Sequence, residues 1–409
     1  MEKTVVLENG VVRGILGESL SPRDLFVLGN VLGEVEAVAL GSSATLQGRN
    51  LARAAAGGIL CAGGRAIVHS LECPVQGAWA GPKLGVPLSL FVEETDGLVY
   101  LHLWDSRGLP LQRDWAKTAE QALCRRELRQ SPGAQAGTLE QADLTVQKWA
   151  LDQAEQVSIG RAPLRRITAA VGTDAPEDRA MREVLLVLGC RLEKKWRPGI
   201  PAFSAGHGGF RLSAQDERGA LLDAGQLLAL VALIEMENGT GKVAVPSGSS
   251  AAVDLVAAGY GGTVLRLDRG GEQARALYAA QPWLWSGPAA AARICVRMGL
   301  SGQKLESLIS KTPRFHAWRR EVPVRSDQTE VLRALARENP RGELGKGLRV
   351  RSGGGWVYLT PTARRSALRV MAESPDLEMA AELCDFYAGR AAALDGEICG
   401  QDGQEEERK

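Results

Sequence analysis

A short segment near the C-terminus, "PTARRSALR" from Pro361 to Arg369, places hydroxyl and guanidinium groups close together. Two adjacent arginines, Arg364 and Arg365, stand between Thr362 and Ser366. A guanidinium group binds phosphate through two parallel hydrogen bonds, and it is well suited to that planar geometry. The segment therefore predicts a phosphate-binding loop that contains all four residues. The alternative is an exposed basic loop without a ligand.

Two other segments place serine and glycine between an apolar run and a helical pattern. They read "ALGSSATLQGRN" and "VPSGSSAAVD". Backbone amides at a helix N-terminus can bind an anion, but serine and threonine are also the common N-cap residues of ordinary helices. We expect N-capping at both places. The sequence contains neither G-x-x-x-x-G-K-[ST] nor G-x-G-x-x-G, so these routes to nucleotide binding have no support.

The histidines and acidic residues show no spacing typical of a metal site. The four histidines are His69, His102, His207 and His316, with no i,i+4 pair among them. We expect His69 and His102, which stand in strand-like runs, to be structural residues with satisfied hydrogen bonds. Glu93, Glu94 and Asp96 come closest to an acidic cluster. Consecutive strand residues point to opposite faces, so we expect a solvated turn there and not an ion site.

Composition limits the partners and the number of domains. A chain of 409 residues is longer than one hydrophobic core can serve, so two to four domains are expected. Forty-nine basic and 48 acidic side chains leave a formal charge of +1, which favours neither nucleic acid nor a membrane surface as a partner. The seven cysteines are widely spaced, which indicates reduced thiols and not a disulfide framework or a zinc site. With no secretory signal and no long apolar run, we expect a cytoplasmic protein.

An apolar run, a turn of small residues, a helical pattern and a glycine recur three times along the chain. The three units begin with "VEAVALGSS" at 35–43, "PLRRITAAVGTDA" at 163–175 and "GKVAVPSGSSAAVD" at 241–254. Each unit predicts a strand, a crossover helix and a second, parallel strand. The segment "GLRVRSGGGWVYLTPTARRSALRVMAES" at 347–374 differs, because it reads as three strands separated by a glycine turn and a polar loop. An amphipathic helix follows it.

Four segments resemble motifs of one enzyme family. "VVRGILGESLSP", with Arg13 and Gly14 in register, is similar to "GIRGxxGxxLTP". "GLVYLHLWDSRGLPL" at 97–111 is similar to "NGIKFxxxDGxxL", and "RLSAQDERGALLDAGQLLALVAL" to "RxxxxDExGxxLxGDxLLALLA". "LTPTARRSALRVMAES" stands where the family has "RPSGTEPxxRVxxE". In this order, and over nearly the whole chain, the sequence resembles the α-D-phosphohexomutase superfamily, the phosphoglucomutase and phosphomannomutase enzymes.

Pattern and resemblance together predict an α/β fold of three consecutive α/β/α modules and a C-terminal α+β domain around a central cleft. We expect mixed, mainly parallel sheets in the modules. The expected boundaries are 1–130 for the first module, 131–141 for a linker, 142–238 for the second module, 239–318 for the third, 322–396 for the C-terminal domain and 397–409 for a disordered tail.

The resemblance also implies a chemistry, which the sequence does not preserve. Active members are intramolecular phosphotransferases that carry phosphate on a serine of a "TASHNP" loop and bind magnesium through three aspartates of "DGDxDR". Here the serine loop reads "GVPLSLFVEETDG", two residues shorter, and Ser89 is its one hydroxyl upstream of the expected position. Anchored on Arg211, the three metal positions fall on Gly206, Gly208 and Phe210. Neither a hydrogen nor a phenyl ring can coordinate magnesium.

The sugar-binding segment is altered as well. Only "QPWLWS" remains where the family has "GExSG", so that loop is shortened and its glutamate is lost. Trp283 and Trp285 would either fill the unused cleft or stack on a sugar ring.

These losses predict a phosphohexomutase-like pseudoenzyme of carbohydrate metabolism with no metal cofactor. We expect it to bind a hexose phosphate through the 362–366 loop, with Arg13 across the cleft, or to regulate a protein partner in sugar-nucleotide or polysaccharide synthesis. One alternative is an active mutase in which Ser89 carries phosphate, magnesium is bound by other acids, and Arg13 and Arg211 keep their family roles. The other is a structural module that docks on a sugar nucleotidyltransferase through its tryptophans.

Overall fold

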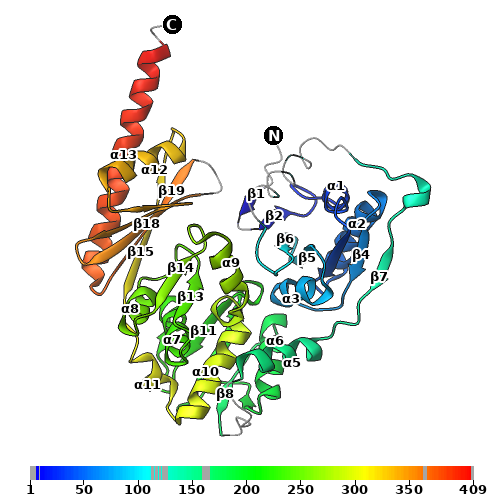
Figure 1. The fold of residues 1–409 in the computed structure, drawn as a ribbon, viewed down its shortest axis with the longest axis horizontal. Coiled ribbons are helices and arrows are strands. Elements are labelled where there is room, and N and C mark those ends of the chain that lie inside the picture. The colour runs from blue at the N-terminus through cyan, green and yellow to red at the C-terminus, as the bar shows by residue number, and fades with distance from the viewer. Residues whose placement is uncertain are drawn as a thin grey trace. The chain divides into compact units, whose positions relative to one another are not determined.

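The computed structural model describes residues 6–8, 10–111, 115, 118, 121, 128–158, 166–362 and 366–406. The chain forms two compact units. The first contains residues 1–221 and 285–303, and the second contains residues 222–284 and 304–409. Figure 1 shows the elements of both units. Within the described residues, no helix is both long enough and apolar enough to cross a membrane.

The first unit opens with a seven-stranded sheet of order β1-β2-β6-β5-β3-β4-β7. β3, β4, β5 and β7 run parallel to their neighbours within this group, and the other pairings are antiparallel. In chain order the strands are β1 (Val6–Glu8), β2 (Val11–Ile15), β3 (Ala37–Ser42), β4 (Arg65–Val68), β5 (Leu88–Thr95), β6 (Leu98–Asp105) and β7 (Leu139–Gln141).

Helices cover both faces of this sheet. α1 (Pro22–Leu32) and α2 (Leu46–Cys61) pack on the face that carries Leu88 and Leu90, and α3 (Pro74–Leu84) packs on the face that carries Phe91. Because side chains alternate along a strand, one apolar strand supplies both layers. Glycine makes the α1–α2 contact close, since a Cβ on Gly58 would lie 2.0 Å from the backbone oxygen of Phe26.

The second sheet of the first unit lies within the predicted second module. Its order is β12-β11-β10-β8-β9, with β8 parallel to β9 and β10, and β10 antiparallel to β11. The strands are β8 (Thr168–Ala170), β9 (Arg191–Glu193), β10 (Ala202–Gly206), β11 (Arg211–Gln215) and β12 (Leu221–Leu222). The helices are α5 (Val146–Val157), α6 (Pro176–Val187) and α10 (Gly287–Ser301), with a 3-10 turn, η2 (His207–Gly209), between β10 and β11.

The second unit begins with a small parallel pair of strands. β13 (Lys242–Val245) and β14 (Thr263–Arg266) are joined through α8 (Ala252–Gly259). The surrounding helices are α7 (Ala224–Glu237), α9 (Gly271–Ala279), the 3-10 helix η3 (Pro282–Leu284) and α11 (Leu305–Ile309).

The C-terminal part of the second unit is an antiparallel sheet of order β15-β19-β18-β17-β16. Its strands are β15 (His316–Pro323), β16 (Glu343–Leu344), β17 (Leu348–Ser352), β18 (Gly355–Pro361) and β19 (Ala367–Ser374). α12 (Gln328–Glu338) and α13 (Leu377–Glu406) pack on the face that carries Val357 and Leu359. In Figure 1 the last turns of α13 extend beyond the sheet. Polar and aromatic side chains occupy the other face.

The structure confirms the fold class. All three predicted strand–helix–strand units pair their strands in parallel, as β3–β4, β8–β9 and β13–β14. The three strands predicted over 347–374 are β17, β18 and β19, and Gly353 and Gly354 adopt positive φ in the turn between the first two. Glycine adopts positive φ more readily than any residue with a side chain.

Three details differ from the expectation. The 131–141 segment is not a plain linker, because β7 within it pairs with β4. The C-terminal sheet begins at His316 and not at residue 322, because β15 pairs along its whole length with β19. The tail predicted to be disordered from residue 397 continues α13 as far as Glu406, because extending a helix that is already formed needs no new nucleation; residues 407–409 lie outside the described residues.

Candidate functional site

The segment that resembles the catalytic serine loop is a regular strand in this protein. β5 pairs with β6 residue by residue from Leu88 opposite Asp105 to Thr95 opposite Leu98. Asp96 and Gly97 form the tight turn, with φ of 51° and 80°. Two consecutive residues of positive φ match the twist of the flanking strands, which is why Asp-Gly favours a hairpin here. No loop is left between the two strands to carry a phosphate.

Ser89 lies inside this hairpin. Its side chain points at α3, where a Cβ on Gly81 would come within 2.0 Å of its Oγ. The residue is 1% exposed, and Oγ has no hydrogen-bond partner among the described residues. The hydroxyl is therefore closed off from solvent by the helix in this conformation.

Of the three acidic residues expected in a solvated turn, Asp96 is exposed in the turn, whereas Glu93 and Glu94 are held by hydrogen bonds. Glu94 is 4% exposed, and its Oε1 accepts a hydrogen bond of 3.0 Å from the Gly97 amide. Glu93 points to the opposite face, where its Oε2 lies 2.7 Å from Nε2 of His102. Both carboxylates are held by the hairpin because the turn amide and the imidazole offer them partners. The expectation that His102 is a satisfied structural residue is confirmed.

His69 does not follow the same expectation. It is 4% exposed and stacks on Phe91 with ring centroids 6.4 Å apart, yet neither of its ring nitrogens has a hydrogen-bond partner among the described residues. Burial lowers the pKa of His69 to about 4, because a charged imidazole would lose its hydration there. The prediction of a satisfied histidine is wrong at this position.

The segment that resembles the metal loop is a glycine-rich turn packed on the start of α3. His207, Gly208 and Gly209 have φ of 51°, 68° and 94°. A Cβ on Gly208 would lie 2.7 Å from Pro74, and one on Gly209 would lie 2.4 Å from Val75. The turn can approach the helix this closely only because these two positions lack side chains.

The side chain of Phe210 points into an aromatic cluster. Its ring centroid lies 6.1 Å from that of Trp104, 6.3 Å from His102 and 6.3 Å from Trp285. Trp104 in turn packs with the fully buried Phe91. Offset and tilted rings at such distances are favourable contacts. Aromatic rings therefore lie beside the turn, and Trp285 is one of them.

The residues at the three family metal positions do not fit magnesium. Gly206 and Gly208 offer no side-chain oxygen, and Phe210 offers a ring, whereas magnesium requires oxygen ligands in near-octahedral geometry. His207, in the same turn, lies 3.4 Å through Nε2 from Nη1 of Arg211. Across the described part of the chain, no group of three or more His, Cys, Asp or Glu residues is arranged to hold a metal ion.

The two arginines that match the family by register lie on strands of the first unit. Arg13 is an exposed residue of β2, with its guanidinium 5.6 Å from the ring centroid of Tyr100. Arg211, also exposed, begins β11. Both guanidinium groups are accessible for an anion.

The predicted phosphate-binding loop belongs to the second unit, between β18 and β19. Arg364 and Arg365 lie outside the described residues. Thr362 is buried, and its hydroxyl donates a 2.8 Å hydrogen bond to the carbonyl of Ala367, which closes the base of the loop. Ser366 is exposed, and its carbonyl accepts a hydrogen bond from the Val324 amide. The base of the loop is thus tied to its own strands.

The two small-residue turns differ in how their helix ends are satisfied. Thr45 caps α2, since its Oγ1 accepts a hydrogen bond of 3.0 Å from the Gly48 amide, and the N-cap expectation is confirmed there. At α8 no side chain caps the helix from the N-cap position, and the Ala251 amide donates instead to Oε2 of Glu373 at 2.8 Å. A carboxylate from β19 thus occupies the helix end.

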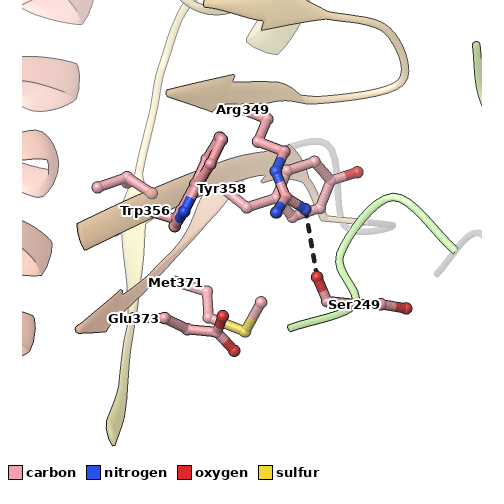
Figure 2. A pocket seen from close by; sticks show the side chains of 7 residues that line it. Ser249, Arg349, Trp356, Tyr358, Met371 and Glu373 are labelled. Carbon is pink, nitrogen blue, oxygen red and sulfur yellow. Dashed lines mark hydrogen bonds between the residues drawn. The ribbon is translucent and has the colours of Figure 1, made fainter. Parts of the chain in front are cut away.

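A small pocket adjoins this helix end (Figure 2). Its volume is about 10 Å³, room for about one water molecule, and it is lined by Ser249, Arg349, Trp356, Val357, Tyr358, Met371 and Glu373. The Arg349 guanidinium lies 4.6 Å from the Trp356 ring centroid and donates to the Ser249 carbonyl at 3.2 Å. No sequence motif marks this pocket, because its residues come from four separate segments of the chain.

Two solved structures with this arrangement of modules are distant from this chain in sequence. A phosphoglucomutase/phosphomannomutase family protein from Burkholderia thailandensis superposes with a TM-score of 0.75 at 16% identity, over 95% of this chain and 97% of that one. Parafusin, a phosphoglucomutase from Paramecium, gives a TM-score of 0.65 at 12% identity, over 93% and 94% of the two chains. This protein has the phosphohexomutase fold. The resemblance seen in the sequence is thereby confirmed at the level of the fold.

Other comparisons extend the phosphohexomutase likeness with less coverage or weaker agreement. N-acetylphosphoglucosamine mutase from Aspergillus fumigatus, solved with GlcNAc-6P and magnesium, gives a TM-score of 0.52 at 9% identity over 93% and 94% of the chains. A phosphopentomutase from Thermococcus kodakarensis is 25% identical over 200 residues, which are 43% of this chain and 44% of that protein. The alignment therefore spans less than half of that relative. No family model matches the sequence.

Proposed function

We propose that this protein is a phosphohexomutase-fold member of carbohydrate metabolism that binds a sugar phosphate, or regulates a partner, without mutase catalysis. The observation that carries the proposal is the β5–β6 hairpin. A mutase serine must accept phosphate from one substrate position and return it to another, so its hydroxyl has to reach solvent and ligand. Here the only serine of the segment is sealed between β5 and α3.

The aromatic cluster supports the same proposal from a second side. Phosphoryl transfer depends on cations that neutralise the charge on the transferred group. Phe210 stands at a metal position of the family and packs against Trp104 and Trp285. Apolar rings in contact make that region unsuited to a dication, which would lose hydration without gaining oxygen ligands.

The proposed ligand is a hexose phosphate held by the loop of Thr362, Arg364, Arg365 and Ser366. Two adjacent arginines offer bidentate contacts to a phosphate group, and these contacts do not require a metal. The names of the similar proteins support sugar phosphates as the ligand class, since one of them was solved with GlcNAc-6P. We place the protein in the cytoplasm, where its cysteines would stay reduced, as a partner of sugar-nucleotide or polysaccharide synthesis.

Isothermal titration with glucose 1-phosphate and glucose 6-phosphate tests the ligand. We expect binding heat that is the same with and without magnesium, and at least about tenfold weaker binding after Arg364→Ala/Arg365→Ala, because charged hydrogen bonds are lost. Arg337→Ala is the matched control, since Arg337 is an exposed arginine of α12. Absence of heat at millimolar ligand would rule out the sugar-phosphate version.

The phosphopentomutase match favours one alternative, an active mutase. Coupled turnover of hexose and pentose 1-phosphates, with intact-mass measurement of the purified chain, distinguishes the two. We expect no turnover and no stoichiometric phosphate. Turnover that disappears in Ser89→Ala would overturn the proposal. The docking version stays a prediction, tested by co-purification with a sugar nucleotidyltransferase in the absence of small-molecule binding.

A further inference from the structure

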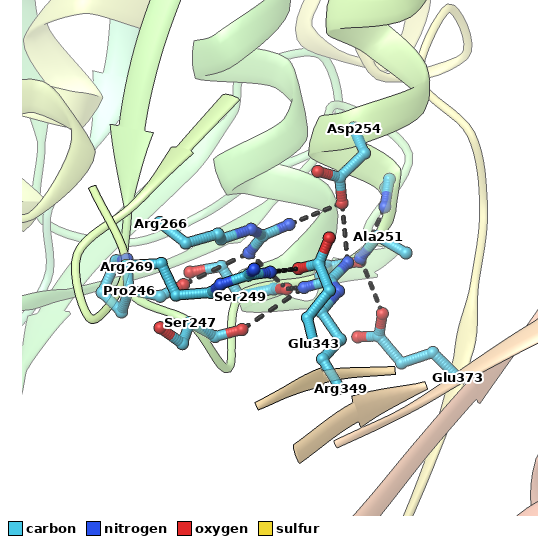
Figure 3. Close-up of polar contacts among 12 residues, drawn as sticks. Pro246, Ser247, Ser249, Ala251, Asp254, Arg266, Arg269, Glu343, Arg349 and Glu373 are labelled. Atoms are coloured by element: carbon cyan, nitrogen blue, oxygen red, sulfur yellow. Dashed lines mark hydrogen bonds and ion pairs between the residues drawn. The ribbon is translucent and has the colours of Figure 1, made fainter. Parts of the chain in front are cut away.

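One carboxylate joins two arginines from different parts of the second unit (Figure 3). Oδ2 of Asp254, on α8, lies 2.5 Å from Nη2 of Arg266 and 2.7 Å from Nη2 of Arg349. Arg266 ends β14, whereas Arg349 belongs to β17 of the C-terminal sheet. Both arginine side chains are 8% exposed, and the Asp254 side chain is 32% exposed. The shared carboxylate therefore ties the third module to the C-terminal sheet through two largely buried guanidinium groups.

The same arginines also hold the turn that precedes α8. Nη1 of Arg266 donates to the carbonyls of Pro246 and Ser249 at 3.2 and 3.0 Å. Nη1 of Arg349 donates to the carbonyls of Ser247 and Ser249 at 3.3 and 3.2 Å. The Ser249 carbonyl accepts from both side chains. The turn is thus clamped by one guanidinium from its own module and by another from the C-terminal sheet.

A second carboxylate, from the C-terminal sheet, binds the third module. Glu373, on β19, is 9% exposed and accepts the Ala251 amide at the start of α8 at 2.8 Å. Burial raises the pKa of Glu373, while that amide and the two arginines oppose the shift. Two arginines and two carboxylates thus lie together at the boundary between the third module and the C-terminal sheet, which we call the seam. Their formal charges add up to zero.

Further contacts at the edge of the seam also join the third module to the C-terminal sheet. Asp268, which follows β14, accepts a hydrogen bond of 3.2 Å from the Lys346 amide. Arg269 Nη1 lies 3.0 Å from Glu343 Oε2 on β16. These contacts are more exposed and contribute less than the buried group, since solvent screens them. They add contacts between the end of β14 and the β16–β17 edge of the C-terminal sheet.

We propose that Asp254, Arg266, Arg349 and Glu373 form a latch that fixes the C-terminal sheet on the third module, so that the second unit moves as one body. Removing one partner of a buried ion group leaves a charge without compensation, which costs far more than losing an exposed pair. Opening the seam would uncover the two arginines and Glu373, which are at most 9% exposed. The latch therefore holds β17 and β19 at a fixed position relative to α8.

Hydrogen–deuterium exchange of the full chain, read by mass spectrometry, tests the latch. In Asp254→Asn we expect exchange of the 246–252 amides, at the turn and first residue of α8, to rise at least tenfold. The amides of β18 should keep their wild-type rates, because the core under α12 and α13 is untouched. Glu338→Gln is the control, since Glu338 pairs with Arg390 within the C-terminal part. It should leave the 246–252 amides unchanged.

Two outcomes would overturn the latch. One is a folded Asp254→Asn protein whose 246–252 amides exchange at the wild-type rate. The other is an equal rise in β18, which would mean general destabilisation. If Asp254→Asn does not fold, Glu373→Gln gives the same comparison, since it keeps the side-chain volume and removes one charge of the seam. Neither result depends on whether the protein binds a sugar phosphate.

Discussion

His69 gives the protein an acid-sensitive point in its first unit. Burial lowers its pKa in the folded protein from the ordinary value of 6.5 to about 4. The unfolded chain therefore binds a proton between about pH 6.5 and pH 4 that the folded chain excludes. By linkage, stability is lost as the pH falls through this window, and the loss is complete below it.

The size of the effect follows from the shift. At pH 5 the unfolded imidazole is almost fully protonated and the folded one is not, which corresponds to about 2 kcal/mol lost relative to pH 7.5. His69→Leu removes the titrating group and keeps a similar volume. It also removes two buried nitrogens without partners, so we expect the variant to be about 1–3 kcal/mol more stable than wild type already at pH 7.5.

Urea unfolding followed by tryptophan fluorescence at pH 7.5 and pH 5 measures both terms. The advantage of His69→Leu over wild type should grow by about 2 kcal/mol at pH 5. Carboxylates that titrate in the same range affect both proteins equally, so the difference isolates His69. His316→Gln, at an exposed position of β15, should show no such growth. An advantage that is equal at both pH values would refute the argument from burial.

Three further substitutions test the packing by urea unfolding. Gly58→Ala should destabilise the first unit by more than about 3 kcal/mol, because the new Cβ would lie 2.0 Å from the Phe26 carbonyl oxygen. Gly57→Ala, whose Cβ would lie 3.5 Å from the Phe26 ring, should be neutral or stabilising by up to about 1 kcal/mol. Similar losses of stability in both variants would contradict the close α1–α2 contact. Trp104→Ala should cost about 3–5 kcal/mol, and a loss below about 1 kcal/mol would show that the aromatic cluster is loosely packed. Thr45→Ala should cost about 1 kcal/mol through the lost N-cap of α2, and Thr45→Ser should restore it.

The modules could be predicted because local signals agree with the tertiary structure. The run that becomes β3 is apolar on both faces, since it is covered by helices on both sides, and the small residues after it mark the turn into α2. The Gly353–Gly354 turn was visible for a similar reason. The start of β15 and the end of α13 were harder to predict. The first depends on pairing with β19 and the second on a helix that is already formed, and the local sequence shows neither.

The candidate site was only partly visible in the sequence. Glycine and phenylalanine at the metal positions could be read directly from the register with Arg211. That the segment resembling the serine loop forms a tight hairpin could not be read, because a strand and a short loop of apolar residues look alike until the partner strand is known. His69 was misjudged, since a buried imidazole without partners leaves no pattern. The latch joins residues 254 and 349, and no motif links positions so far apart.

The hairpin of β5 and β6 also bears on how such a chain could change over time. Its eight consecutive pairs fix which face each side chain takes, and a slip by one residue would move every β5 side chain to the opposite face of the sheet. Single substitutions leave this register intact, so none of them alone would move Ser89 out from under α3. Inserted residues would be needed before a loop with an accessible hydroxyl could form at this position.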